Sequence, residues 1–220
     1  MSAIMRDIHN LMEKYDPEYL YFVSETFLAM PNNWRREFYD RYYEECRLPF
    51  WMNTRPEQIN KTDVYELARC RCHRISLGVE HGNGAFRKNV LGRNYTNKKI
   101  IDACKMIKDA GIQLSVNNMV GFPDETEKLI WDTVLLNRKL EADSHTVSVF
   151  QPYWGTGLRD VCVKKGYIPA DFICSGYRFA EPVLNMPQLD NRMIKTYYNN
   201  FNKWVEEKEF KYAIISNSGR

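Results

Sequence analysis

The sequence lacks any apolar run long enough to cross a membrane. Its longest apolar stretches have the length of a strand, far below the roughly 20 residues that a membrane-spanning helix needs. An excess of one charge is also missing, because 31 basic and 28 acidic residues leave a formal net charge of +3 and no block of lysine or arginine. Residues 1–15 have an amphipathic pattern without the apolar core of a signal peptide. We therefore expect a cytoplasmic protein that has no membrane partner and no nucleic-acid-binding surface.

Several catalytic motifs are absent as well. There is no phosphate-binding P-loop, no G-x-G-x-x-G turn and no Ser/His/Asp set, which excludes the reaction classes built on them. The six cysteines are scattered along the chain, and we interpret them as reduced thiols. Cys70, Cys72 and His73 form a C-x-C-H stretch that could supply metal ligands, although its spacing differs from that of common zinc sites. A metal-dependent barrel enzyme that uses these residues is therefore a weak alternative.

Hydrophobic patterning predicts an α/β fold. Short β-rich runs occur at residues 19–24, 50–54, 75–80, 112–119 and 145–151. Helical patterns lie between and after them, at residues 33–47, 55–69, 85–90, 97–110, 125–141 and 191–205. This alternation indicates parallel βα units with right-handed crossovers. Five strands are too few for a closed eight-stranded barrel, so we expect an open or partial one.

Polar residues follow every predicted strand. They are Ser24-Glu25-Thr26, Asn53-Thr54-Arg55, Glu80-His81, Asn117-Asn118 and Gln151-Pro152-Tyr153. Chemistry in parallel α/β folds gathers at the C-terminal ends of the strands. Several polar groups that converge on one rim are typical of a small-molecule site, and we expect such a site here.

Each of these groups also has a purely structural interpretation. Glu80 can form a rim ion pair with Arg93 or Lys88, and Asn117 can stabilise a turn. Residues 121–126 can be a simple strand-to-helix turn, whose acidic residues suit the helix dipole. Residues 152–157 can be a Gly-rich loop, and His81 is as consistent with an exposed position as with a catalytic one.

Taken together, four stretches resemble one family. LGVEHGN, LGRNYT, AGIQLSVNNMVGFPDET and VFQPYWGTGL are similar to the middle and C-terminal part of a radical S-adenosylmethionine (radical SAM) domain, in the branch that often carries a cobalamin-binding domain upstream. The resemblance covers residues 8–205 and implies a partial (β/α)6 TIM-like barrel, strands two to six. In this family a [4Fe–4S] cluster binds SAM, and reduction yields a 5′-deoxyadenosyl radical that abstracts hydrogen from a substrate.

The resemblance implies roles for individual residues. Glu80 matches the position that touches the SAM ribose or amino group, and Arg93 matches the position that pairs with the methionyl carboxylate. Further cofactor-binding positions are Asn117, near the ribose, and Gly121, Phe122, Pro123, Gln151 and Tyr153, near the adenine. Glu25, Asn53 and Arg55 are candidates for the substrate side of the site.

The family's cluster motif, C-x3-C-x2-C, is absent from the sequence. Because an Fe–S cluster needs thiolates held close together, we expect this chain not to ligate it. We predict the truncated or split C-terminal portion of a radical SAM enzyme, which binds SAM but is inactive alone on an unknown substrate. Residues 1–160 would form the core barrel and residues 161–220 a helical C-terminal extension. An alternative is a non-catalytic binding or scaffold barrel, or a split subunit completed by a polypeptide that carries the cysteines.

Overall fold

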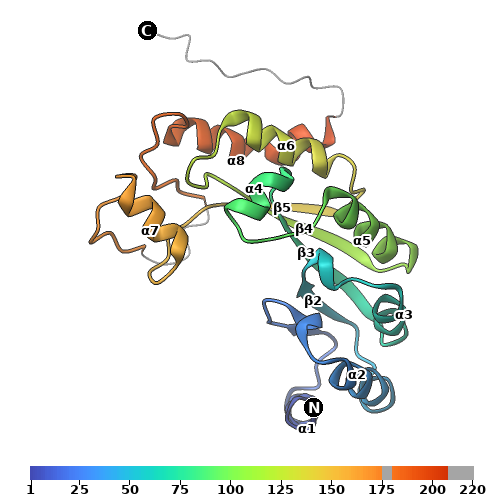
Figure 1. Cartoon of the computed structure of the whole chain (residues 1–220). Coiled ribbons are helices and arrows are strands. Elements are labelled where there is room, and N and C mark those ends of the chain that lie inside the picture. The colour runs from blue at the N-terminus through green and yellow to red at the C-terminus, as the bar shows by residue number, and fades with distance from the viewer. Residues whose placement is uncertain (175–179, 208–220) are drawn as a thin grey trace. The chain divides into compact units, whose positions relative to one another are not determined.

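The computed structural model describes residues 1–174 and 180–207. Five strands form one parallel sheet in the order β1-β2-β3-β4-β5 (Figure 1). Their bounds are β1 Leu20–Phe22, β2 Phe50–Thr54, β3 Cys72–Glu80, β4 Gln113–Val120 and β5 Ser144–Val149. The predicted α/β class with a parallel sheet is therefore confirmed.

Helices alternate with these strands along the chain. They are α1 Ser2–Tyr15, α2 Asn32–Glu45, α3 Lys61–Arg69, α4 Gly84–Asn89, α5 Asn97–Asp109, α6 Glu127–Asn137, α7 Gly157–Lys164 and α8 Asn191–Glu206, with 3-10 helices at Phe27–Ala29 and Pro56–Gln58. The helix expected over residues 55–69 is divided, because the Asn60 side chain accepts a hydrogen bond from the Asp63 N–H and caps a new helix. In the described part of the chain, no helix is both long and apolar enough to cross a bilayer.

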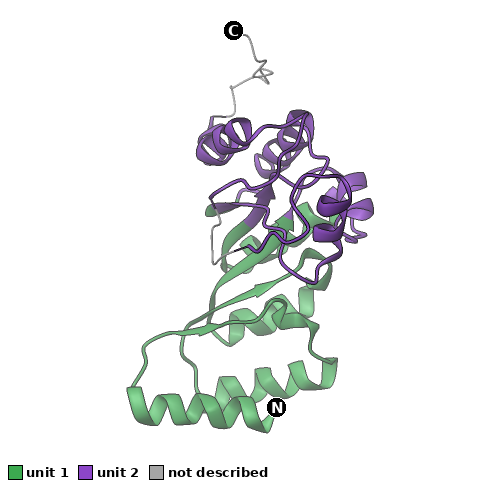
Figure 2. Cartoon of the chain, turned by 90° about the vertical axis from the view of Figure 1, so that its left-hand side faces the viewer, with its two compact units in different colours: residues 1–79, 98–116, 142–144 green, residues 80–97, 117–141, 145–220 purple. Residues whose placement is uncertain are grey.

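The chain divides into two compact units (Figure 2), the first made of residues 1–79, 98–116 and 142–144. In this unit β1 pairs with β2 and β2 pairs with β3, both in parallel. Its core is rich in aromatic rings: the Phe22 and Phe50 centroids lie 5.2 Å apart, and those of Tyr42 and Phe50 lie 5.0 Å apart, both edge to face. Such pairs add about 0.5–1.5 kcal/mol to the stabilisation from burial.

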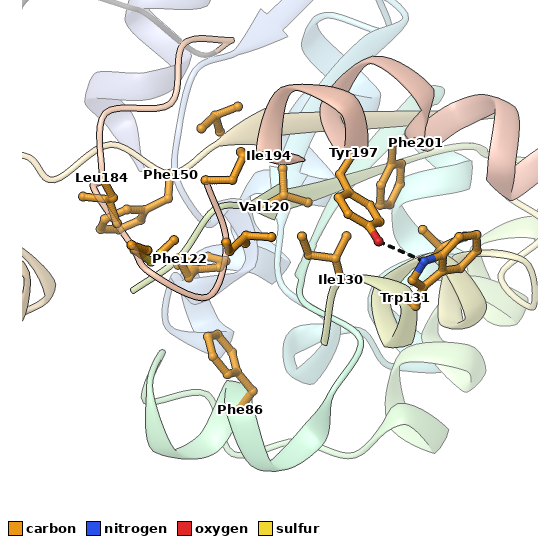
Figure 3. Close-up of a cluster of buried hydrophobic side chains, with 14 of the residues drawn as sticks. Phe86, Val120, Phe122, Ile130, Trp131, Phe150, Leu184, Ile194, Tyr197 and Phe201 are labelled. Carbon is orange, nitrogen blue, oxygen red and sulfur yellow. Dashed lines mark hydrogen bonds between the residues drawn. The ribbon is translucent and has the colours of Figure 1, made fainter. Parts of the chain in front are cut away.

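The second unit consists of residues 80–97, 117–141 and 145–220, and its described part has a separate hydrophobic core (Figure 3). Helices α6 and α8 lie side by side in it (Figure 1). Trp131 Nε1 donates a hydrogen bond to Tyr197 Oη at 3.2 Å, and Tyr197 Oη donates to Glu127 Oε2 at 2.7 Å. Helix α8 thus contributes directly to this core, and the expected domain boundary at residue 160 stays a prediction.

Candidate functional site

Strand β3 ends in a carboxylate with an unusual backbone conformation. Glu80 has a φ of 65°, in the left-handed region that residues other than glycine rarely adopt. The strand before it is anchored, because Leu77 and Val79 are completely buried. Strained backbone of this kind persists only where the surrounding structure fixes it, and such residues cluster at functional sites. Glu80 is therefore the first residue around which a site can be built.

The segment after β3 places Arg93 next to the Glu80 carboxylate. The Asn83 side chain caps α4, and Gly92, with a φ of 63°, turns the chain after that helix. The Arg93 N–H then donates to Arg87 O at 2.9 Å. As a result Arg93 Nη2 lies 3.3 Å from Glu80 Oε1, and the two side chains are 20% and 21% exposed. The ion pair predicted between these two residues is confirmed.

A buried arginine, Arg87, stabilises the segment between β3 and Arg93 by hydrogen bonds. Arg87 is completely buried, and its guanidinium donates to His81 O, to Tyr95 O at 3.0 Å and to Asn97 Oδ1 at 2.7 Å. Burial lowers the pKa of Arg87, and the nearby Tyr95 opposes this effect. Asn97 Nδ2 donates to Gly82 O at 2.9 Å. These bonds join the start and the end of the segment that carries Arg93.

The turn between β4 and α6 supplies a second group of site residues. Gly121 has a φ of 80°, and a Cβ at this position would lie 3.1 Å from Ile194 Cγ2, so both conformation and close packing favour glycine. Asp124 accepts hydrogen bonds from Lys165 Nζ at 2.6 Å and Tyr167 Oη at 2.7 Å. Burial acts to raise the pKa of Asp124, but the hydrogen bonds from Lys165 and Tyr167 outweigh it and lower that pKa.

These segments line a cleft of about 810 Å³ within the second unit. This volume lies in the range of roughly 300–1,000 Å³ that small-molecule sites occupy. The charged residues of the lining are Glu80, Arg93 and Asp124. The others are Asn89, Val90, Leu91, Gly92, Met119, Phe122, Pro123, Val149, Phe150, Gln151, Tyr153, Thr156, Gly157, Leu158 and Val161. The cleft therefore combines a mostly apolar wall with one guanidinium and two carboxylates.

Most of the predicted cofactor-binding residues meet in this cleft. Glu80, Arg93, Pro123, Gln151 and Tyr153 all belong to its lining. The side-chain amide of Gln151 is engaged within the protein, since its Nε2 donates to a backbone carbonyl at 2.8 Å and its Oε1 accepts from a thiol at 3.1 Å.

Two predicted cofactor-binding residues are not in the lining. Gly121 shapes the turn behind Phe122, and Asn117 lies in the middle of β4. The substrate-side candidates Glu25, Asn53 and Arg55 belong to the other unit, where Asn53 Nδ2 donates to Tyr21 Oη at 3.0 Å. Their roles stay predictions.

Two buried residues were not recognised from the sequence. His81 is completely buried, so the interpretation of this residue as exposed is wrong. Its Nε2 lies 3.1 Å from Oε1 of Glu125, which is also completely buried. Sequence reasoning attributed the acidic residues of this turn to the dipole of the following helix. The four-residue spacing from Gly121 to Glu125 was the available signal, because it lets the carboxylate accept hydrogen bonds from the N–H groups of the turn.

The cysteines do not fit a [4Fe–4S] cluster. Cys70, Cys72, Cys104 and Cys162 are buried, and none of the six cysteines forms a disulfide. Burial raises the pKa of the Cys70 and Cys104 thiols to about 12 and that of Cys162 to about 11. Burial therefore disfavours the thiolate form of these groups, which is the form that ligates a cluster.

The C-x-C-H stretch does not form a metal site either. Cys70 Sγ donates to Tyr39 O at 3.2 Å, and His73 Nδ1 lies 3.0 Å from Tyr19 Oη. Across residues 1–174 and 180–207, no three His, Cys, Asp or Glu side chains come close enough together to hold a metal. We therefore assign no metal or cluster chemistry to these residues.

A family model described as the radical SAM superfamily matches residues 2–136. The chain belongs to the radical SAM superfamily. An uncharacterized methyltransferase from Pyrococcus horikoshii is 25% identical over 194 residues, which cover 88% of this chain and 42% of the relative. A tRNA-2-methylthio-N(6)-dimethylallyladenosine synthase from Halalkalibacterium halodurans is 34% identical over 84 residues, 37% of this chain and 15% of the relative. The radical SAM chain thus spans less than half the length of these relatives.

Solved structures of radical SAM enzymes share the fold. The methyltransferase TsrM from Kitasatospora setae, solved with cobalamin and a [4Fe–4S] cluster bound, gives a TM-score of 0.63 at 17% identity and covers 74% of this chain and 31% of its own. Coproporphyrinogen III oxidase (HemN) from Escherichia coli also gives a TM-score of 0.63, at 13% identity, and covers 92% of this chain and 46% of its own. At these identities the similarity concerns the fold.

Proposed function

We propose that the cleft of this radical SAM chain binds S-adenosylmethionine. The observation that carries the proposal is the Glu80–Arg93 pair on the wall of a mostly apolar cleft. SAM has matching chemistry, because it carries an ammonium and a carboxylate at its methionyl end and a planar adenine at the other. Charge-assisted hydrogen bonds and a bidentate guanidinium–carboxylate contact are the strong interactions available to such a ligand.

Each end of SAM has suitable partners in the lining. Arg93 would bind the methionyl carboxylate, and Glu80 would accept hydrogen bonds from the ammonium group or from the ribose hydroxyls. The aromatic rings of Phe122, Phe150 and Tyr153 provide apolar surface for the adenine, against which planar rings pack favourably. Asn117 remains an additional candidate for a contact with the ribose.

The reaction class and the substrate are further proposals. SAM supplies a radical or a methyl group in this family, and the names of the two relatives favour methyl or methylthio transfer. Because the cysteines do not fit the cluster, we propose that these residues bind SAM and do not cleave it reductively by themselves. Glu25, Asn53 and Arg55 remain the candidates for contact with a substrate.

Calorimetric titration of SAM into the purified chain tests the binding proposal. Arg93→Ala should weaken binding by about 10–100-fold, because hydrogen bonds to charged groups contribute about 1.5–3 kcal/mol and each 1.4 kcal/mol changes affinity tenfold. Arg93→Lys should bind with intermediate affinity, since it keeps the charge and loses the planar fork. Lys88→Ala is the matched control, because Lys88 lies on the exposed surface of α4 and outside the cleft lining.

Two results would contradict the proposal. One is the lack of saturable SAM binding by the wild-type chain. The other is an Arg93→Ala variant whose affinity equals that of Lys88→Ala.

A further inference from the structure

The residues after β3 are bonded one by one to the segment that begins at the β4–α6 turn. The contacts are His81 Nε2 with Glu125 Oε1 at 3.1 Å, the Gly82 N–H with Thr133 Oγ1 at 2.8 Å and Asn83 Nδ2 with Asp132 Oδ2 at 2.8 Å. All six residues belong to the second unit. Two parts of the cleft lining adjoin these contacts in the chain, Glu80 beside His81 and residues 122–124 beside Glu125, so their relative position depends on the contacts.

Hydrogen bonding fixes the tautomer of the His81 ring. The Asn83 N–H lies 3.0 Å from His81 Nδ1, and a backbone N–H can only donate, so Nδ1 must be the acceptor. The ring proton is therefore on Nε2, where it faces the Glu125 carboxylate. Both ring nitrogens are used, and the side chain is completely buried.

The Glu125 carboxylate links His81 to the cleft wall by hydrogen bonds. Its second oxygen, Oε2, accepts hydrogen bonds from the N–H groups of Gly121 and Phe122, the latter at 3.1 Å. Phe122 lines the cleft, and its ring centroid lies 6.2 Å from that of His81 in an edge contact. His81 is also the residue next to Glu80 in the chain. One buried imidazole thus belongs to the residue after Glu80 and contacts the aromatic wall of the cleft.

We propose that His81 is a positioning residue of the cleft. As the Nε2–H tautomer, it holds Glu80 and the Phe122 turn in the relative position that binds SAM, without touching the ligand itself. This inference rests on the proposed function. It adds a buried residue that affects the affinity for SAM without contacting SAM.

Two substitutions separate the two hydrogen bonds of the ring. His81→Asn places an acceptor close to the position of Nδ1 and removes the donor to Glu125, whereas His81→Gln keeps a donor near Nε2 and removes the acceptor for the Asn83 N–H. Each should weaken SAM binding about fivefold to tenfold, which corresponds to the loss of one hydrogen bond. His81→Phe, which keeps a ring and loses both bonds, should weaken binding more than either.

His145→Gln is the matched control, because it removes the donor at the position of Nδ1. His145 is in the same unit, half-buried and outside the cleft lining, and its Nδ1 lies 2.9 Å from Asn137 Oδ1. We expect this variant to lose thermal stability, because it loses that hydrogen bond, and to retain the wild-type affinity for SAM. His81 variants that behave like this control would overturn the inference, because their effect would then be on stability alone.

Amide hydrogen exchange gives a readout that does not require SAM. His81→Gln should speed exchange at Asn83 and leave Gly121 and Phe122 protected, and His81→Asn should do the reverse. The same exchange pattern in both variants would contradict the proposed division of the two bonds. If the wild-type chain does not bind SAM, the proposed function fails, and the exchange pattern alone decides whether His81 holds the two walls together.

Discussion

Replacement of Gly82 by alanine tests how tightly the segment after β3 packs against α6. A Cβ at Gly82 would lie 2.1 Å from Asp132 O, 2.3 Å from Asp132 C and 2.4 Å from Thr133 Cα. All three atoms belong to the backbone of α6, which cannot move away as easily as the end of a flexible side chain. The alanine variant must therefore move either the 81–83 segment or a turn of α6.

The cost of this movement has two parts. Overpacking of a well-filled interior costs about 1–3 kcal/mol. The shift also breaks the hydrogen bond from the Gly82 N–H to Thr133 Oγ1, whose length is 2.8 Å, and a buried donor left without a partner costs about 1–3 kcal/mol. We expect a total loss of about 3 kcal/mol in the free energy of unfolding. For a chain of this size this corresponds to a fall of roughly 6–12 °C in Tm.

Gly84→Ala is the control for this experiment, two residues further along the chain. There the nearest atom to a new Cβ is Arg87 Nη2 at 3.7 Å, an ordinary contact, and the residue is the first of α4. Alanine should therefore be neutral or stabilise the protein by up to about 1 kcal/mol. Urea unfolding followed by circular dichroism measures both variants. The reasoning would be refuted if Gly82→Ala lost less than about 1 kcal/mol, or if the two variants behaved alike.

Two further predictions concern the cysteines. Anaerobic reconstitution of this chain with iron and sulfide should give no [4Fe–4S] absorbance near stoichiometric yield, and a full cluster would contradict the assignment of Cys70, Cys104 and Cys162 as isolated thiols. The free energy of unfolding should also fall as pH rises from about 9 to about 12, because thiols with an ordinary pKa of 9.0 ionise in the unfolded chain while Cys70 and Cys104, with a pKa of about 12, stay protonated in the folded one. Urea titrations across this range should show a shallower decline in a Cys70→Ala/Cys104→Ala variant, and an unchanged slope would count against burial as the cause.

Local sequence patterns were sufficient to predict the sheet and part of the site. The bounds of β2 agree with the predicted run, and the other strands differ from theirs by a few residues at their ends. The pairing of Glu80 with Arg93 was predictable because a strand end and a Gly-Arg turn are both local signals. Helix α7, by contrast, begins in a Gly-rich stretch, and its start depends on the Thr156 side chain as a cap, which the Gly-Thr-Gly context obscured.

The buried residues next to the cleft, His81, Gly82 and Glu125, were not predictable in the same way. His81 and Glu125 are separated by 44 residues in the sequence, and no periodic pattern relates them. Gly82 resembled any glycine of a turn, and only the position of the α6 backbone shows why a side chain cannot fit there. Contacts of this kind are specified by packing between elements, which single-sequence reasoning does not reach.

The Glu80–Arg93 pair can serve structure and binding at once. Paired at 3.3 Å in a mostly apolar cleft, the two charges compensate each other, whereas one buried charge without a partner would cost several kcal/mol. A zwitterionic ligand brings an ammonium group for Glu80 and a carboxylate for Arg93, so it can compensate both charges. A simple carboxylate ligand would compensate the charge of Arg93 and bring no charge for Glu80. If the cleft binds SAM as we propose, the ion pair also contributes selectivity for an amino-acid end, and the two interpretations of these residues do not compete.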